Sequence, residues 1–366
     1  MIAVRDTGAE RGAKGFSSWD QFVAMLFCQL GRAHSLREIC GGLATATGKL
    51  RHLGLQQAPK RSTLSYANSH RPWQLHQLVF FQMLGRCQAL AATKKRKFRF
   101  KNKLISMDST IIDLCLSTFD WARFRRAKGA VKLHLLLDHD GYLPSFAVVT
   151  DGKTHDVTVA KTLSFQPGTI LVFDRAYIDF GWLARLDWSK VFFVTRQKSN
   201  ILFEVLSYQP AKRGVLLDSI IRLTGPAGEK YPGLLRRVVV LDPNSGRSIA
   251  FITNNMKLSN STIAAVYKER WQIELFFKAL KQNLKIKTFL GTTPNAVKTQ
   301  IWTALIAMLL LKFMQLKSSF GWSLSNLAAM VRMNILTYRD LWAWLDAPFE
   351  TPVQEPPAVQ LVLNLS

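Results

Sequence analysis

The chain has 366 residues, of which 48% are hydrophobic, so it can form a packed core as one large domain or as two to three smaller ones. It carries 49 Lys and Arg against 24 Asp and Glu, a net charge of +25. This charge disfavours an enzyme for small substrates and favours a partner with a dense row of phosphates. The simpler alternative is a ribosomal or membrane-surface protein. The ten Trp argue against a tail-like basic protein, which would be poor in aromatic residues.

The sequence indicates a cytoplasmic protein that does not enter a membrane. Residues 1–15 lack the apolar core of a signal peptide. Residues 301–311 form the longest apolar stretch, which is too short to span a bilayer and predicts a buried helix. The cysteines form no CxxC pair, so neither a zinc site nor a disulfide framework is expected. The four are Cys28, Cys40, Cys87 and Cys115.

Residues 1–92 are expected to form a helical, DNA-binding domain. An apolar-periodic helix is predicted over residues 22–30, and Ser35 with Glu38 has the spacing of a capping box before a second helix. A third helix is predicted to begin at Arg61, and free N–H groups at such a helix start can bind phosphate. A basic bundle that only supports the core explains this segment equally well.

Residues 93–103 are the densest basic run, and we interpret them as a linker that also touches phosphate. Beyond them the pattern changes to strands. The predicted strands are residues 104–108, 130–138, 143–150, 169–173 and 191–195, and the predicted helices are residues 156–163 and 178–187. The order β-β-β-α-β-α-β is that of a ribonuclease-H-like fold, although the pattern alone establishes only a mixed α/β sheet.

Residues 196–255 are expected to form a β-rich insertion, with short alternating stretches separated by Pro and Gly. The chain then becomes helical to about residue 344. The predicted class is therefore α/β, a ribonuclease-H-like catalytic core with a β-rich insertion, preceded by a helical N-terminal domain and followed by a helical C-terminal region. The predicted core is residues 104–195 and 256–300, the C-terminal helical region 301–347 and the extended tail 348–366. Most of the Trp, including Trp302, Trp322, Trp342 and Trp344, are expected in the core.

Two acids, Asp108 and Asp174, lie at the C-terminal ends of predicted strands. Ligands bind at such strand ends in open α/β sheets. A carboxylate buried there needs a cation or an Arg partner to offset its desolvation. Taken alone, either Asp is more simply explained as a helix N-cap.

A third acid, Glu274, lies on a predicted helix with Tyr267, Arg270 and Lys281. At about 100° per residue these four side chains fall within about 60° on one side of the helix. One acid, two bases and a phenol suit a phosphodiester site, because the acid can bind metal while the bases hold phosphates. The alternative is a surface row of weak ion pairs.

The pattern Tyr-x2-Arg-x3-Glu-x6-Lys resembles the Tyr-Arg-Glu-Lys (YREK) signature of a large family of bacterial insertion-sequence transposases. Asp-Ser-Thr at Asp108 and Asp-Arg-Ala-Tyr at Asp174 are similar to that family's first and second acidic motifs. The resemblance covers roughly residues 103–290. Residues 61–68 also resemble the helical domain often fused to this core.

The resemblance implies a cut-and-paste DNA transposase. Asp108, Asp174 and Glu274 would hold two Mg²⁺ ions, with Mn²⁺ able to substitute. Water would nick the element end, and the freed 3′-OH would attack the opposite strand to form a hairpin before attack on target DNA. The implied partners are the terminal inverted repeats and target DNA, with a homodimer in the synaptic complex. The implied location is the bacterial cytoplasm, with the nucleoid.

By the same resemblance, Tyr267, Arg270 and Lys281 would grip phosphates near the cut end. The other candidate DNA-binding residues are basic, namely Arg175, Lys278, Lys95, Arg96, Lys97 and Arg61. Two alternatives stay open: a nuclease of the same fold that cuts without joining, and a catalytically inactive DNA-binding relative. The three intact acids argue against the inactive relative. No Gly-rich phosphate loop is present, so no ATP requirement is implied.

Some members of the family stack a flipped base on a Trp of the insertion, but residues 196–266 contain no Trp. Phe203, Tyr208 or Tyr231 could substitute. Three further polar residues are candidates to lie near the cleft, His155, Lys132 and His134.

Overall fold

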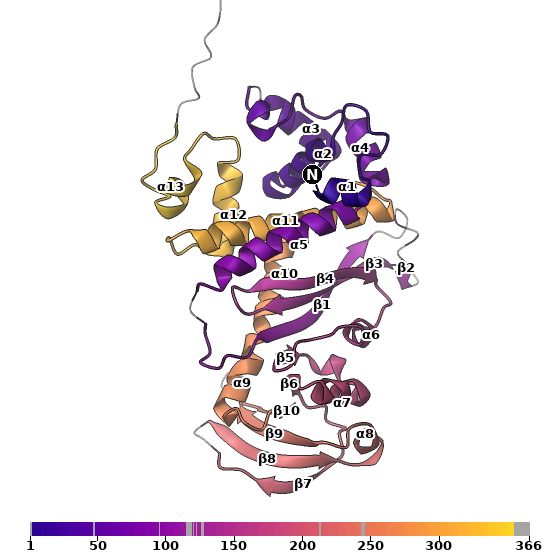
Figure 1. Ribbon diagram of the computed structural model, residues 1–366, viewed down its shortest axis with the longest axis vertical. Coiled ribbons are helices and arrows are strands. Elements are labelled where there is room, and N and C mark those ends of the chain that lie inside the picture. Colours follow the sequence, from indigo (N-terminus) through magenta and orange to yellow (C-terminus); the bar gives the residue numbers. More distant parts are fainter. Residues whose placement is uncertain are drawn as a thin grey trace, which may run out of the picture. The chain divides into compact units, whose positions relative to one another are not determined.

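A computed structural model of the protein describes residues 2–46, 48–94, 96–114, 119, 121, 123–125, 128–211, 214–242 and 246–354. The chain divides into two compact units, and Figure 1 labels the helices and strands that compose them. The first unit contains Met1–Leu90 and Ala279–Ser366, and the second contains Ala91–Lys278. The domain boundaries expected from the sequence stay predictions.

The first unit is helical. Its elements are α1 (Ile2–Thr7), α2 (Ser18–Gly31), α3 (Leu36–Thr45), the 3-10 helix η1 (Leu50–Leu53), α4 (Arg61–His70), α5 (Gln74–Ala91), α11 (Pro294–Lys317), α12 (Leu324–Met333) and α13 (Leu341–Asp346). Helix α11 is central and packs against α2, α4 and α12. The helices predicted over residues 22–30, after Ser35 and from Arg61 are confirmed. Helix α5 was not predicted, because its apolar residues lie all round the helix and give no periodic signal.

Side-chain caps explain where two of these helices begin. The Ser17 hydroxyl accepts a hydrogen bond from the Asp20 N–H, and the Asp20 carboxylate accepts one from the Ser17 N–H. The Ser35 hydroxyl accepts from the Glu38 N–H at 3.1 Å. Each such cap contributes about 1 kcal/mol. Gly41 and Gly42 lie within α3 and do not end it.

Helix α11 carries the core of the first unit. It is long and apolar enough to span a membrane, but 72% of its most apolar stretch is buried inside the protein, as expected of residues 301–311. Trp302, Trp322 and Trp344 are buried as predicted. The prediction for Trp342 is wrong, because this residue is 48% exposed on the short surface helix α13, against Phe313. Trp19, Trp121, Trp188 and Trp271 are exposed too, so the core does not hold most of the Trp.

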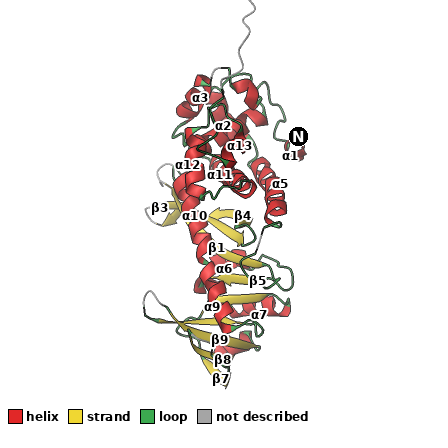
Figure 2. Cartoon of the chain, turned by 90° about the vertical axis from the view of Figure 1, so that its left-hand side faces the viewer, coloured by secondary structure: helices red, strands yellow, loops and turns green. Residues whose placement is uncertain are grey.

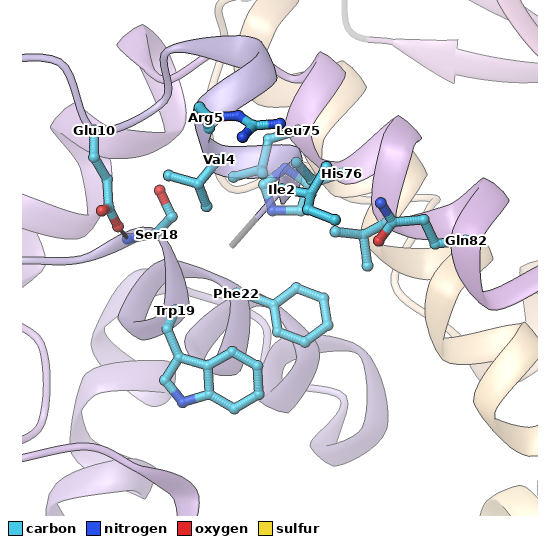
Figure 3. Close-up of a pocket in the computed structure, with 12 residues that line it drawn as sticks. Ile2, Val4, Arg5, Glu10, Ser18, Trp19, Phe22, Leu75, His76 and Gln82 are labelled. Atoms are coloured by element: carbon cyan, nitrogen blue, oxygen red, sulfur yellow. Dashed lines mark hydrogen bonds between the residues drawn. The ribbon is translucent and has the colours of Figure 1, made fainter.

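A cavity of about 830 Å³ opens between α1, α2 and α5 in the first unit. Figure 3 shows Trp19 and Phe22 of α2 and His76 of α5 on its wall. The His76 side chain is 1% exposed, and neither ring nitrogen has a hydrogen-bond partner among the described residues. Burial, helped by the positive charge of Arg71, lowers the pKa of His76 to about 4. The fold therefore contains a buried, neutral imidazole to which no described residue offers a hydrogen bond.

His76→Leu is expected to raise the free energy of unfolding by about 1 kcal/mol at pH 7, since an unpartnered buried polar group is costly. The folded-state pKa lies below the usual 6.5, so the unfolded chain takes up the proton first and the wild type loses stability as pH falls from about 6.5 towards 4. The advantage of the variant should grow by about 2 kcal/mol at pH 5. Urea unfolding at both pH values measures this. If the stability advantage of His76→Leu does not grow at pH 5, the prediction is contradicted. His155→Leu is the control, because His155 is exposed.

All described strands belong to the second unit (Figure 2). They are β1 (Leu104–Leu114), β2 (Arg123–Arg125), β3 (Lys128–Asp138), β4 (Leu143–Asp151), β5 (Ile170–Phe173), β6 (Phe192–Arg196), β7 (Phe203–Tyr208), β8 (Val215–Leu223), β9 (Leu234–Leu241) and β10 (Ser248–Thr253). They form one ten-stranded sheet in the order β2-β3-β1-β5-β6-β10-β9-β8-β7, with β4 also paired to β3. The strands predicted for the insertion thus continue the core sheet through the β6–β10 pair.

Helices cover both faces of this sheet. On one face, α6 (Asp156–Ala160), α7 (Phe180–Trp188) and α8 (Gly225–Lys230) pack over a core that includes Met107, Phe173 and Trp182. On the other, α9 (Asn260–Glu269) packs over Val172 and Val194. The ribonuclease-H-like, mixed α/β class is confirmed, with helices before and after the sheet. The predicted order β-β-β-α-β-α-β is found with one addition, the three-residue strand β2 between β1 and β3, which was not predicted. The residues of helix α8 were expected to form an irregular connection between two strands, because their sequence contains Gly-Pro.

Candidate active site

Asp108 and Asp174 lie side by side at the end of a parallel strand pair. Strand β1 pairs with β5 in parallel through Met107 and Phe173, and each Asp follows the last residue of that pairing. The prediction that Asp108 ends its strand is wrong, because β1 continues to Leu114 against β3. Asp108 therefore lies where β1 extends beyond the shorter β5, which still leaves its carboxylate beside a strand end.

Asp174 also caps a 3-10 helix. Its Oδ1 atom accepts a hydrogen bond from the Ala176 N–H at 2.9 Å, at the start of η3 (Arg175–Tyr177). The cap expected as the simpler explanation of an Asp at this position is thus present. It fixes one carboxylate oxygen, and a carboxylate has a second oxygen with which to bind a cation.

The helix predicted to carry Tyr267, Arg270 and Glu274 is interrupted. Helix α9 ends at Glu269 and α10 (Trp271–Asn283) begins at Trp271, so the expectation of one continuous helix is wrong. Arg270 keeps helical dihedral angles at the junction, and its N–H donates to the Tyr267 carbonyl at 3.0 Å. Arg270 still lies over the Tyr267 ring, 5.8 Å from its centre.

Arg270 joins two acids that are far apart in the sequence. Its Nη1 atom lies 3.6 Å from Asp108 Oδ2 on β1, and its Nη2 atom donates to Glu274 Oε1 on α10. The Arg270 side chain is 14% exposed, less than those of Asp108 at 21% and Glu274 at 34%. A buried guanidinium between two carboxylates shows that this place stabilises positive charge.

The surroundings make Asp108 a weaker acid than an ordinary Asp. Burial raises the pKa of Asp108 to about 6, and the negative charges of Glu274 and Asp174 add to the rise. The Ser109 N–H and Arg270 oppose it by stabilising the carboxylate. Three mutually repelling carboxylates in a partly buried place are the arrangement that a multivalent cation stabilises.

The donor chemistry of these residues fits a hard divalent ion, although the carboxylates are not gathered round one point. Mg²⁺ prefers oxygen ligands, and Asp108, Asp174 and Glu274 supply them. Among the described residues no three acidic, His or Cys side chains form a ready cluster. Arg270 accounts for this, since a divalent ion about 4 Å from its guanidinium would be repelled by about 8 kcal/mol at an effective dielectric constant of 20.

A second polar network lies on the opposite face of β1. Asp156 Oδ1 accepts a hydrogen bond from the Ser109 hydroxyl at 2.6 Å and lies 3.3 Å from Lys132 Nζ and 3.5 Å from His134 Nδ1. Neighbouring strand residues point to opposite faces, so Ser109 faces away from the Asp108 carboxylate. Lys132 and His134 therefore serve this network, whose acid was not identified from the sequence. His155, its neighbour, is exposed.

The candidate DNA-binding residues are scattered. Arg175 follows Asp174 and is exposed, and Lys278 is exposed one turn beyond Glu274 on α10. Lys281 lies in the last turn of α10. Arg61 is exposed at the first position of α4 in the first unit, and Lys95 lies outside the described residues.

Two residues of the basic linker are held by acids of the protein itself. Lys97 Nζ lies 2.6 Å from Glu269 Oε1, and Glu269 is 5% exposed at the end of α9. Arg96 Nη2 lies 2.8 Å from Asp140 Oδ2. Any DNA contact by these side chains would therefore compete with an internal ion pair, most strongly for Lys97, whose partner is buried.

The aromatic side chains of the insertion differ in how far a base could reach them. Tyr208 is 68% exposed on β7. Phe203 is half-buried under the Arg237 guanidinium, 5.3 Å from its ring centre. Tyr231 is 1% exposed and its hydroxyl donates to Asp187 at 2.8 Å, so the expectation that it might stack on a base is not supported.

Comparison with known proteins places the chain in a family. The family described as Transposase DDE domain matches residues 99–310, and a domain of unknown function, DUF4372, matches residues 2–56. A protein of Sinorhizobium fredii named as a transposase, y4zB, is 34% identical over 75% of this chain and 77% of its own length. A protein of Geobacillus stearothermophilus named as the transposase of insertion sequence element IS5377 is 31% identical over 74% of this chain and 72% of its own length.

A piggyBac transposase, solved as a synaptic complex with hairpin DNA, is 10% identical and has a TM-score of 0.43 over 91% of this chain and 72% of its own length. The family match includes Asp108, Asp174 and Glu274, and it covers more than half of the chain. The chain therefore belongs to the transposases with a DDE domain, enzymes that cleave DNA and transfer its strands.

Proposed function

We propose that the chain is an active cut-and-paste transposase whose catalytic carboxylates are Asp108, Asp174 and Glu274. One observation carries this assignment. The Arg270 guanidinium contacts an acid from β1 and an acid from α10, beside the strand end that carries Asp174. Two acids so far apart in the sequence that contact the same cation are better explained by a catalytic site than by chance surface pairing.

The three carboxylates would hold two divalent ions, Mg²⁺ with Mn²⁺ able to substitute. When bound, such a pair stabilises the attacking and leaving oxygens of an in-line displacement at phosphorus. Burial raises the pKa of Asp108 only to about 6, so its carboxylate is available as a ligand at neutral pH. Tyr267, Arg270 and Lys281 fit the YREK signature, and we assign them to the phosphates next to the cut. Arg270 suits a bidentate phosphate contact.

The order of the steps that we propose is the one that the resemblance to the YREK family implies. Water would cut the element end, the freed 3′-OH would attack the opposite strand to form a hairpin, and the reopened end would attack target DNA. Helix α4, with Arg61 at its exposed start, belongs to the part that we propose binds DNA, together with Arg175, Lys278 and the linker residues Arg96 and Lys97. Pairing of two element ends requires at least a homodimer on DNA. The cell compartment would be the bacterial cytoplasm, with the nucleoid.

A supercoiled plasmid carrying the inverted repeats that flank the coding sequence tests this function. With Mg²⁺ we expect excised element, hairpin ends and products joined to target DNA. Cleavage without joined products would favour a nuclease of the same fold. Binding without cleavage would favour the inactive relative. Light scattering of the cleaved complex should give two protomers per pair of ends, and one protomer would contradict the homodimer.

A further inference from the structure

We propose that Arg270 occupies the place of the metal ions until DNA arrives, so that loading of metal and binding of a DNA phosphate are coupled. The inference rests on the proposed function, because it takes Asp108, Asp174 and Glu274 as the metal-binding carboxylates. It adds regulation of that site, because the protein without DNA neutralises these acids with the Arg270 side chain.

The contacts of Arg270 support a resting position that DNA can release. The guanidinium reaches Asp108 on one side and Glu274 on the other, so it screens the two carboxylates from each other. Its Nε atom is buried and has no hydrogen-bond partner among the described residues. Arg270 therefore stabilises this place mainly through its positive charge, and the hydrogen-bonding capacity of its guanidinium is only partly used.

The position of Arg270 in the chain allows it to leave. It lies at the junction of α9 and α10, between the last residue of one helix and the first residue of the next. A change of side-chain rotamer is enough to move the guanidinium off the carboxylates without unfolding a helix. A DNA phosphate offers the bidentate acceptor that a guanidinium prefers, and the two carboxylates are then left to a divalent ion.

Thermodynamic linkage makes this testable without measuring catalysis. If phosphate binding frees the carboxylates, DNA must strengthen metal binding, and metal must strengthen DNA binding by the same factor. Coupling between two such sites is usually about 5- to 150-fold. A protein in which Arg270 cannot bridge the acids should bind metal tightly with or without DNA.

The experiment is a titration of the full chain with Mn²⁺, followed by electron paramagnetic resonance, with and without a short blunt-ended DNA duplex. Without DNA, Arg270→Gln should bind Mn²⁺ at least about fivefold more tightly than the wild type. Arg270→Lys keeps the charge but reaches one carboxylate at a time, so its Mn²⁺ affinity should lie between those of the wild type and Arg270→Gln. The matched control is Arg196→Gln, which removes an exposed charge close enough to act on Tyr267 and should bind Mn²⁺ as the wild type does.

With the duplex present, the wild type should approach the affinity of Arg270→Gln, and the difference between the two should largely disappear. If wild type and Arg270→Gln bind Mn²⁺ equally tightly without DNA, the coupling is overturned. In that case the assignment of the metal-binding carboxylates still stands if Asp108→Asn has lost Mn²⁺ binding. Mn²⁺ binding that Asp108→Asn leaves unchanged overturns the carboxylate assignment itself, and the coupling with it. Circular dichroism of each variant establishes that it is folded.

Discussion

Asp108→Asn is expected to reduce cleavage of element-end DNA by at least about 10³-fold, a loss of about 4 kcal/mol of transition-state stabilisation. Asn is nearly the same size as Asp but cannot supply a negatively charged ligand. Asp174→Asn and Glu274→Gln should lose a similar amount. Because the three act as a unit, a double variant should be little worse than a single one. Quantified cleavage of the plasmid substrate measures these losses.

Asp113→Asn is the matched control. Asp113 lies on the same strand as Asp108, is exposed, and points to the other face of the sheet. Its variant should cleave as the wild type does. Thermal unfolding should show that Asp108→Asn is folded, since Asn removes a charge whose burial is unfavourable. Cleavage at the wild-type rate by Asp174→Asn or Asp108→Asn would refute the assignment of the acids.

Arg236→Met is expected to lower the free energy of unfolding by about 3–5 kcal/mol, because it leaves a buried carboxylate without its cation. Arg236 binds both Asp218 oxygens, at 2.8 and 2.6 Å, and the Asp218 side chain is completely buried. Burial alone would raise the pKa of Asp218, yet hydrogen bonds from Arg236 and Asn260 hold it below its usual value. Arg236 also donates to the Leu258 carbonyl, just before α9, so the pair fastens β8 and β9 to the helix that leads to Arg270.

Denaturant unfolding of three proteins tests this expectation. The double variant Asp218→Leu, Arg236→Met removes both charges and should recover most of the loss. Arg222→Met is the matched control, since Arg222 and Glu204 form a similar pair between β7 and β8 that is 53% and 48% exposed. Its loss should be below about 1 kcal/mol. A small loss in Arg236→Met, equal to that of Arg222→Met, would show that the buried pair contributes no more than the exposed one.

The sequence predicted the elements of the second unit well, because its signals there are local. Alternation and turn residues located the strands, and the acids after them led to Asp108 and Asp174. What it could not predict was pairing. Strand β1 extends beyond the end of β5 because it continues to pair with the longer strand β3, and Asp108 therefore lies within β1. Asp156 was missed for the same reason, since its partners come from β1 and β3 and share no sequence pattern with it.

The break at Arg270 had no signal in the sequence. Its neighbours Glu269 and Trp271 are compatible with a continuous helix, and neither Gly nor Pro lies nearby. In the structure Glu269 is buried against Lys97 and the Tyr142 hydroxyl, contacts that involve residues more than a hundred positions away. Tertiary contacts thus decide where the helix ends. The contact between Arg270 and Glu274 is an i,i+4 pair that helical periodicity predicts. The contact between Arg270 and Asp108 joins α9–α10 to a distant strand and could not be derived from that periodicity.

The pairing of β6 with β10 has a consequence for how this protein tolerates insertions and deletions. If residues 197–253, which include β10, were removed, the backbone edge of β6 beyond β5 would be left open, and its apolar sequence would be prone to pair with other chains. Tags or added segments are better placed in hairpin connections, which lie outside the ladder of hydrogen bonds. The connection around Gly246, between β9 and β10, is one such place. Length variation among relatives should concentrate there rather than at the junctions with β6.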